Sequence, residues 1–437
     1  MGDLLEIRLD RSLKQAPVAF WQSPRGWLTE KKLSRGFWVF FTAAFFFDFG
    51  FAVYFFLFNL YLLDLHFNER VMGLVGGALT LGSVIGTLPV GLFARRIGLR
   101  PLLLFCFVMA PLMGILRAVI IWEAAQIALA FLAGLAMCIW GVCFLPAIAR
   151  LTTEKNRASA FGLIFSVSIG TSALGGLVCG YLPQWLHAAG IVMQAAEVKR
   201  LILIVSCVIA LAGIIPVFKL RLPVQPDEPK FQSRGWPQVW RLHPFLLRFL
   251  PAMALWTAVL ASFTPFANVY LSRDLRIPLS NIGLIFSIAQ VIQFCMGLLT
   301  PIVFRWLGLV NGIVATEVVT AVAIGCLAGA RNHGLAIALY LTFSASQWMS
   351  SPGLYNLLMS RVPDSERSTA SAMTMFCNAL LQSAATAIAG ILFAQFGYPR
   401  VLVGIMALAL TAAALFKMLI TPADDLGRNT PPAHVLG

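Results

Sequence analysis

Apolar stretches of about 20 residues recur along almost the whole chain, and each is long enough to cross the hydrocarbon core of a bilayer as a helix. Short breaks that contain charged residues, proline or glycine separate them. Hydrophobic residues make up 59% of the 437 residues and charged residues only 11%, a balance too apolar for a soluble globular protein. Because backbone groups in lipid must be hydrogen-bonded within their own segment, the stretches predict membrane-spanning helices rather than a barrel.

The pattern predicts an all-α membrane protein with twelve spans. Their expected ranges are 37–63, 71–94, 101–121, 124–148, 158–186, 201–220, 246–271, 280–304, 311–330, 334–358, 369–396 and 400–420. The division between the third and fourth spans rests only on Trp122 and Glu123.

The basic residues predict the orientation of these spans, because Lys and Arg near span ends are retained in the cytoplasm. With an internal N-terminus, 24 of the 32 Lys and Arg residues lie in the cytoplasmic segments and 8 on the opposite side. Both termini are therefore expected in the cytoplasm, and the protein in the plasma membrane, which in a bacterium is the inner membrane. The net charge of +14 is then explained by anionic lipid rather than nucleic acid.

Two matched loops indicate an internal repeat. "TTEKNRASAFG" aligns with "PDSERSTASAM", placing Glu154 over Glu366, and "GLFARRIGLRP" aligns with "PIVFRWLGLVN", placing Arg95 over Arg305. The expected organisation is a basic cytoplasmic segment (1–36), a six-helix bundle (37–220), a cytoplasmic loop rich in proline and charge (221–245), a second six-helix bundle (246–421) and a cytoplasmic tail (422–437).

At these residues the chain resembles the major facilitator superfamily. The family's loop between spans two and three reads Gly-x-x-x-Asp-Arg-x-Gly-Arg-Arg, and here Gly91, Arg95, Arg96, Gly98 and Arg100 stand in that pattern, with arginine in place of the aspartate. The resemblance implies two pseudo-symmetric bundles, with spans one, four, seven and ten around a central cavity and spans three, six, nine and twelve at the periphery.

Charged residues of the matched loops form a candidate cytoplasmic gate. The family's aspartate faces a helix N-terminus, which repels a cation such as Arg95. Acids at the starts of helices five and eleven are expected to complement the arginines instead. The candidate gate comprises Arg95, Arg96, Glu154, Arg157, Arg305, Glu366 and Arg367. The alternative is that these charges act only as retention signals, since exposed ion pairs are individually weak.

Three ionisable residues lie inside predicted spans, where a charge is costly unless it has a task or a partner. Asp48 lies roughly 18 Å from the cytoplasmic end of span one, close to the midplane. Arg117 and Glu317 belong to spans three and nine, which the resemblance places at the periphery. Asp48 is therefore the predicted proton-coupling residue, and the alternative is a carboxylate permanently bonded to a neighbouring helix. His66 shares its predicted helix face and is the expected outer end of a proton path, or else an exposed loop histidine.

Uncharged polar and indole side chains in the spans are candidate ligands for an organic solute. The predicted substrate-binding residues are Asn59, Trp140, Trp256, Asn268, Gln290, Gln293, Gln347, Trp348, Asn378 and Gln382. Such residues also join helices to one another in membranes. Because no Arg or Lys lies in the spans expected to line the cavity, an obligate anion is disfavoured as the substrate.

The function expected is secondary active transport of a small organic solute by alternating access, coupled to protons. A drug or metabolite exporter that exchanges protons, a membrane receptor and a lipid-moving protein of the same fold remain alternatives. An enzyme is not expected, because no histidine lies deep in a span, and no phosphate-binding Gly-Lys-Ser/Thr loop indicates direct use of ATP. No cofactor, metal or disulfide is expected, and the predicted partners are the solute, the proton and membrane lipid, with the protein a monomer.

Overall fold

The computed structural model describes residues 33–190, 193–222, 244–363 and 367–420, all of which belong to helices or the short links between them. The first half of the chain forms seven of these helices. They are α3 (Arg35–Asp64), α4 (Glu69–Ile97), α5 (Leu99–Val119), α6 (Glu123–Leu151), α7 (Glu154–Ala188), α8 (Ala195–Ala212) and the short α9 (Ile214–Lys219).

The second half repeats this arrangement with one interruption. Its elements are α10 (Pro244–Phe263), a single 3-10 turn η3 (Thr264–Phe266), α11 (Ala267–Arg273), α12 (Leu279–Leu307), α13 (Leu309–Gly329), α14 (His333–Arg361) and α15 (Arg367–Leu419). The last of these consists of two helices that meet at Gly397, whose φ of 73° is outside the helical range. The helices therefore follow the twelve predicted spans.

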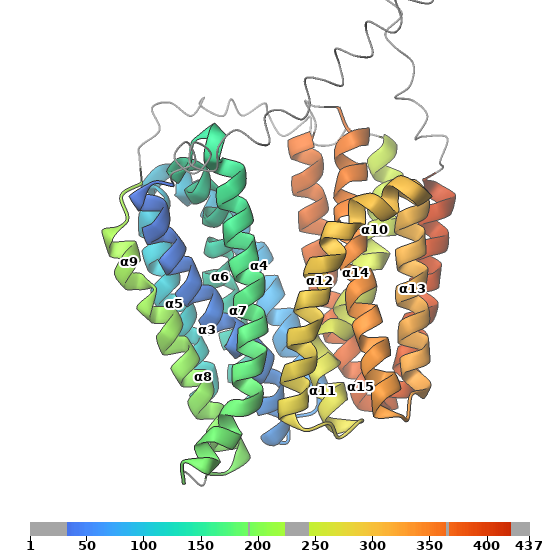
Figure 1. Ribbon diagram of the computed structural model, residues 1–437, viewed down its shortest axis with the longest axis horizontal. Coiled ribbons are helices and arrows are strands. Elements are labelled where there is room, and N and C mark those ends of the chain that lie inside the picture. The colour runs from blue at the N-terminus through green and yellow to red at the C-terminus, as the bar shows by residue number, and fades with distance from the viewer. Residues whose placement is uncertain (1–32, 191–192, 223–243, 364–366, 421–437) are drawn as a thin grey trace, which may run out of the picture.

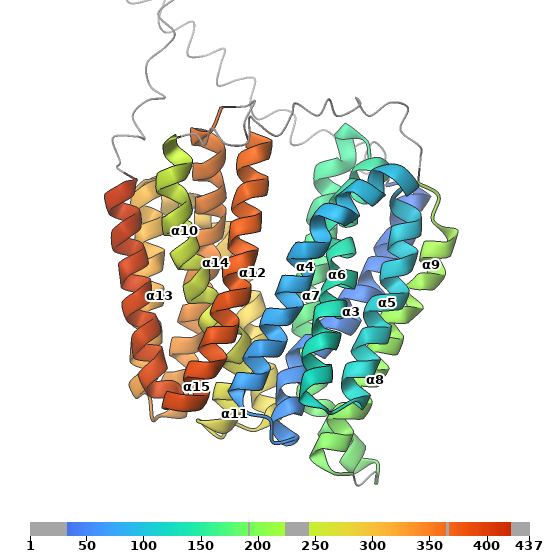
Figure 2. The ribbon, with the colours of Figure 1, turned by 180° about the vertical axis from the view of Figure 1, so that it is seen from behind.

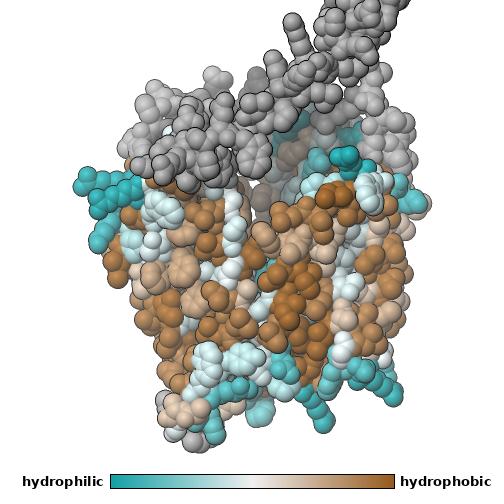
Figure 3. Space-filling view, in the orientation of Figure 1, coloured by the Kyte–Doolittle hydropathy of each residue, from teal (hydrophilic) through white to brown (hydrophobic). Residues whose placement is uncertain are grey.

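The length and composition of the helices fit a membrane protein. Ten of the described helices are long and apolar enough to cross a bilayer, one of them being the double helix Ala370–Leu419. The helix α14, which carries several serines and Gln347, is the predicted span outside this group. Figure 3 shows a broad hydrophobic band around the middle of the molecule, with hydrophilic residues gathered at both ends. Such a band is the surface that lipid tails require.

The helices form two bundles that lie side by side (Figure 1). Helices α3 to α9 make one bundle and α10 to α15 the other, and the view from behind shows the same division (Figure 2). Contacts between the bundles come mainly from α4 against α15 and from α7 against α12. The end of the molecule at which α3 begins is called the Arg35 end below, and the opposite end the Asp64 end.

The two loops matched in the sequence have the same backbone conformation. Gly98 ends α4 with a φ of 85°, and Gly308 ends α12 with a φ of 78°. Left-handed values of this kind suit glycine because it has no Cβ. The loop before the third helix of each half therefore turns in the same way, as the repeat predicts.

Small residues let helices approach closely at several crossings. Gly176 of α7 faces Gly283 of α12, and Gly73 of α4 faces Gly390 of α15, so the glycine-rich segment of α7 serves helix packing. Within the first bundle, a Cβ on Gly134 of α6 would collide with the backbone carbonyl of Leu79 in α4. Without a hydrophobic drive between helices in lipid, such close backbone contact is a principal source of helix association.

The α4–α6 contact gives a stability prediction. We expect Gly134→Val to lower the apparent melting temperature of the purified protein, because overpacking of this kind costs about 1–3 kcal/mol. Gly141→Val is the matched control, since a Cβ at Gly141 of the same helix meets nothing within 4 Å. Equal melting temperatures for the two variants, measured by thermal unfolding in detergent, would contradict the role of this contact.

Candidate functional site

A cavity of about 460 Å³ lies between the two bundles and takes its lining from both. Its apolar wall includes four phenylalanines, which are Phe55, Phe56, Phe58 and Phe286. Its polar lining includes Asn59, Arg117, Ser172, Thr264, Asn268, Gln290 and Gln382. A mostly apolar hollow with a few polar groups is typical of a site for a small organic molecule.

Two asparagines close this cavity toward the Asp64 end with reciprocal hydrogen bonds. The side-chain nitrogen of Asn59 in α3 donates to the carbonyl of Pro265 in η3 at 2.7 Å, and that of Asn268 in α11 donates to the carbonyl of Phe56 in α3, also at 2.7 Å. Asn268 follows Asn59 by 209 residues, and Pro265 follows Phe56 by 209. The two bonds are therefore equivalent under the internal repeat.

Pro265 interrupts the helix beside this closure. Proline has no N–H, so the carbonyl of Ala261, four residues earlier, lacks its helical donor. The hydroxyl of Thr386 in α15 takes that place and donates to Ala261 at 3.1 Å. The break in the helix thus satisfies its backbone through neighbouring helices, as a break inside a membrane requires.

Further hydrogen bonds join the bundles along the two main crossings. Ser383 of α15 donates to the carbonyl of Gly77 in α4 at 2.7 Å, and Ser287 of α12 donates to that of Ala173 in α7 at 2.6 Å. Across the described residues, the hydrogen bonds between the bundles join the halves of α3, α4 and α7 nearer the Asp64 end to η3, α11, α12 and α15. The cavity is therefore closed by polar contacts on that side.

An ion pair completes the closure at the Asp64 end. Nη1 of Arg273, the last residue of α11, lies 2.5 Å from Oε1 of Glu69, the first residue of α4. The Glu69 side chain is only 2% exposed, whereas that of Arg273 is 53% exposed. The carboxylate is thus withdrawn from water and depends on the guanidinium from the other bundle.

Asp48 lies in α3 beside the cavity, in contact with a neighbouring helix. The hydroxyl of Ser168 in α7 donates to Oδ2 of Asp48 at 2.7 Å, and the indole of Trp140 is a second polar neighbour of the carboxyl. Asp48 and Ser168 each precede a cavity-lining residue, Ala52 and Ser172, by four positions. The hydrogen-bonded pair therefore lies one helical turn, about 6 Å, from the lining toward the Arg35 end.

Arg117 differs from its expected place at the periphery. Its side chain is 3% exposed and lines the cavity, with the guanidinium carbon 4.1 Å from the ring centroid of Phe58 and 5.9 Å from that of Tyr54. The prediction that no basic side chain lines the cavity is therefore wrong. The helix α5 is indeed set behind α3, but an arginine side chain is long enough to pass the phenylalanine and reach the hollow.

Glu317 lies away from the cavity, within the second bundle. Its side chain in α13 is 1% exposed, and neither carboxyl oxygen has a hydrogen-bond partner among the described residues.

The ten predicted ligands divide into two groups. Asn59, Asn268, Gln290 and Gln382 line the cavity. The other six do not, and most of them contact other helices instead. Trp256 donates a hydrogen bond to Ser350, and Gln293 donates one to Ser344. Gln347 accepts from Thr264, and Trp140 packs among phenylalanines that include Phe47 and Phe144. Trp348 is exposed and Asn378 is half-buried. The Oδ1 atom of Asn378 is itself buried and has no hydrogen-bond partner among the described residues.

His66 does not extend the helix face that carries Asp48 and Asn59. The helix α3 ends at Asp64, and His66 lies in the following turn with a φ of 63° and an exposed side chain. The prediction of a shared face, which assumed a continuous helix from Asp48 to His66, is therefore wrong. Left-handed backbone occurs at turns, where the helical period no longer applies.

The predicted cytoplasmic gate is only partly described. The side chains of Arg95 and Glu154 and the whole of Glu366 lie outside the described residues. Arg96 and Arg305 are exposed, Arg157 is half-buried, and Nε of Arg367 donates to the carbonyl of Val362 at 3.2 Å. The pairing of these arginines with the acids Glu154 and Glu366 stays a prediction.

The sequence contains a signal for the reciprocal closure. Asn59 lies in "NLY" and Asn268 in "NVY", at equal places in the two halves. The tyrosines of these triplets also match: Tyr61 donates to the carbonyl of Ala118 and Tyr270 to that of Leu327, both over a separation of 57 residues. The cavity-lining phenylalanines carried no such signal, because phenylalanine is frequent throughout the chain.

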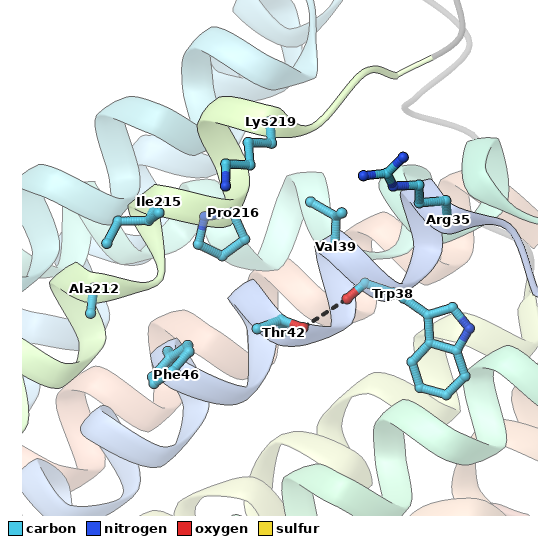
Figure 4. A pocket seen from close by; sticks show the side chains of 9 residues that line it. All are labelled: Arg35, Trp38, Val39, Thr42, Phe46, Ala212, Ile215, Pro216 and Lys219. Carbon is cyan, nitrogen blue, oxygen red and sulfur yellow. Dashed lines mark hydrogen bonds between the residues drawn. The ribbon is translucent and has the colours of Figure 1, made fainter.

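A second cavity of about 450 Å³ opens on the outer surface of the first bundle (Figure 4). It lies between the start of α3 and the helices α8 and α9, and Arg35 and Lys219 border it together with apolar residues such as Trp38 and Ile215. Only one bundle contributes to it, so a motion between the bundles would not move a solute held there. The central cavity is therefore the candidate site.

The ion pair at the Asp64 end gives a conformational prediction. We expect Arg273→Gln to favour separation of the bundles at that end, because removing one partner of a buried ion pair costs about 3–5 kcal/mol. The distance distribution between spin labels at Arg70→Cys and Asn281→Cys, in a protein lacking the other cysteines, should gain a longer component.

Lys199→Gln is the matched control. Lys199 of α8 pairs with Asp64 of α3 at 2.7 Å, at the same end but within one bundle. Its loss should leave the distance distribution unchanged. A longer component in both variants, or in neither, would contradict the role of Glu69 and Arg273 in closure.

Comparisons with known proteins agree with this architecture. A family model described as the Major Facilitator Superfamily matches residues 40–386. The nucleoside transporter NupG has a TM-score of 0.73 at 14% identity, over 88% of this chain and 99% of that one. A bacterial homolog to the human lysosomal transporter Spinster, inward-facing and unoccupied, has a TM-score of 0.72 at 12% identity, over 88% and 97%.

The xylose transporter XylE from E. coli, in an inward open conformation, has a TM-score of 0.68 at 14% identity, over 88% of this chain and 96% of that one. No curated protein matches the sequence. Identities this low speak for the fold alone, whereas the family match covers most of the chain. The protein belongs to the Major Facilitator Superfamily.

Proposed function

We propose that the protein is a secondary transporter that moves a small organic solute across the plasma membrane by alternating access, coupled to protons through Asp48. With both termini in the cytoplasm, the Asp64 end faces outward. The polar contacts between Asn59, Asn268, Glu69 and Arg273 then close the outer side. This arrangement corresponds to an inward-facing state, in which the solute exchanges with the cytoplasm.

The hydrogen bond between Ser168 and Asp48 carries the proposal of proton coupling. An acid inside a membrane span is costly when ionised unless a partner compensates it, and such residues are usually functional. Here the partner is a hydroxyl, which can donate to an ionised carboxylate or accept from a protonated one. Both protonation states therefore have a hydrogen bond, as a residue that binds and releases a proton requires.

The location of Asp48 links protonation to the solute. Asp48 and Ser168 lie on α3 and α7, each one turn from a residue of the cavity lining. The helix α7 also packs against α12 of the other bundle. A change at this pair is thus transmitted both to the cavity and to a crossing that must move during alternating access.

We predict that Asp48→Asn abolishes coupling. In proteoliposomes, uptake of a solute identified by a thermal-shift screen and driven by an imposed pH gradient should fall by about tenfold or more, since the variant cannot carry a proton. Exchange of labelled for unlabelled solute without a gradient should persist. Unchanged gradient-driven uptake would remove Asp48 from the mechanism.

Glu317→Gln is the control for this experiment, because Glu317 is an intramembrane acid buried within the second bundle in α13, away from the α3–α7 pair beside the cavity. It should retain gradient-driven uptake. An uncoupler should collapse accumulation by the wild-type protein. Persistent, gradient-independent movement of lipid would instead favour a lipid-moving protein of the same fold.

A further inference from the structure

We propose that Arg117 binds the carboxylate of the transported solute, so that the substrate is an organic monocarboxylate with an apolar body. The inference rests on the proposed function, because it takes the central cavity as the solute site. It reverses the expectation from sequence that anions are disfavoured.

The environment of Arg117 holds its guanidinium at the cavity wall. Its carbon lies 4.1 Å from the ring centroid of Phe58 and 5.9 Å from that of Tyr54, at cation–π range for both. Tyr54 is itself fixed, since its hydroxyl donates to the carbonyl of Gly114 at 3.3 Å. Gln126 of α6 donates to the carbonyl of Arg117 at 2.6 Å and so anchors the end of α5.

Apart from these rings, the guanidinium has no hydrogen-bond or ion-pair partner among the described residues. Its Nε is buried and has no hydrogen-bond partner among the described residues. The ion pairs of Lys199 with Asp64 and of Arg273 with Glu69 do not include Arg117. A buried arginine remains charged, and a buried charge is expected to be paired. The group that completes the pairing is thus external to the described chain.

Asp48 does not fill that place. It precedes Phe58 by ten residues on α3, a separation of about 15 Å along the helix, and its carboxyl is engaged by Ser168. No acidic side chain is among the residues that line the cavity. An anion that enters the cavity meets Arg117 as the single charged group of that lining.

The rest of the lining indicates what accompanies the carboxylate. Phe55, Phe56 and Phe286 offer ring surfaces, with Phe56 and Phe286 in an edge-to-face contact at 5.2 Å. The side-chain nitrogens of Asn59 and Asn268 are committed to the closure. Gln290 and Gln382 make no hydrogen bond within the described protein and are available to one neutral polar group of a solute.

Charge balance favours a carboxylate over a phosphate. A phosphate monoester carries a charge of about −1.5 to −2 at neutral pH, which one guanidinium leaves partly uncompensated. A carboxylate carries one negative charge and accepts two parallel hydrogen bonds from an arginine. With the carboxylate on Arg117 and a proton on Asp48, the loaded site is neutral, which lowers the cost of holding both inside the membrane.

Binding to the purified full-length protein tests the proposal. The probes are benzoate, 3-phenylpropionate and cyclohexanecarboxylate, each beside its primary amide, and phenyl phosphate. Thermal shift followed by calorimetry should find at least one carboxylate bound about tenfold more tightly than its amide, since charge-assisted bonds are roughly twice as strong as neutral ones.

Variants of Arg117 assign the effect to the residue. Arg117→Gln should weaken binding of that carboxylate by about tenfold and leave the amide unchanged, and Arg117→Lys should retain part of the preference, since lysine keeps the charge without the planar fork. Arg70→Gln, at an exposed arginine of the same end, is the control. Each variant is compared only if its size-exclusion profile and its melting temperature without ligand match those of the wild type. If Arg117→Gln does not fold, the test relies on Arg117→Lys.

Several results would overturn the proposal. These are equal binding of acid and amide, carboxylate affinity that is unchanged in Arg117→Gln, binding of phenyl phosphate without any carboxylate, and no binding of any carboxylate probe. A failure of the proposed function looks different. The carboxylate would then bind in an Arg117-dependent way but would not accumulate in proteoliposomes under a pH gradient, whereas accumulation of a neutral amide through Asp48 would refute the anion site alone.

Discussion

Backbone groups inside a membrane must find hydrogen bonds within the protein, and the closure of the cavity depends on this constraint. At Pro265 the helix formed by α10 and α11 is interrupted by the turn η3. The carbonyl of Ala261, which loses its helical donor, accepts from Thr386, and the carbonyl of Pro265 accepts from Asn59. The Pro265 carbonyl is free because the N–H of Val269, four residues later, donates to Oδ1 of Asn268 instead. The interrupted helix thus presents an acceptor through which one bundle holds the other.

Charged groups inside the membrane obey the same constraint in different ways. Asp48 has a hydroxyl partner from the neighbouring helix α7, and Arg117 lies against aromatic rings at the edge of the cavity. Glu317 has no partner among the described residues. Only the first two lie near the hollow between the bundles. Burial alone therefore does not single out a candidate, whereas proximity to the cavity makes Asp48 and Arg117 the candidates for a functional charge.

The fold was largely predictable from the sequence, and the site only in part. Hydropathy is a property of about 20 consecutive residues, so it survives errors at individual positions, and the repeat correctly paired Gly98 with Gly308. Contacts such as Ser168 with Asp48 join residues 120 positions apart and depend on the rotation of each helix about its axis. That rotation is set by packing, including glycine contacts such as Gly176 with Gly283, which hydropathy does not encode.

The placement of Arg117 shows why helix position alone was insufficient. The resemblance to the family assigns a place to each helix axis, but an arginine acts at the end of a long side chain, away from that axis. His66 failed for the converse reason, since a periodicity argument holds only while the helix continues, and α3 ends at Asp64. Only some of the ligands predicted from polar residues line the cavity, because amides and indoles also join helices, as Trp256 does with Ser350.

The internal repeat separates the parts that close the cavity from the parts that distinguish a solute. Asn59 and Asn268 exchange equivalent bonds across the two halves, and Tyr61 and Tyr270 repeat one contact with the third helix of each bundle. The same offset of 209 residues places Thr257 opposite Asp48 and Cys326 opposite Arg117. Neither counterpart carries a charge comparable to its partner. Rocking of two similar bundles needs symmetric contacts, whereas binding an asymmetric solute and a proton needs groups that one half alone provides. The charges of the proposed site therefore reside in the first bundle, and the second supplies the neutral wall against which they act.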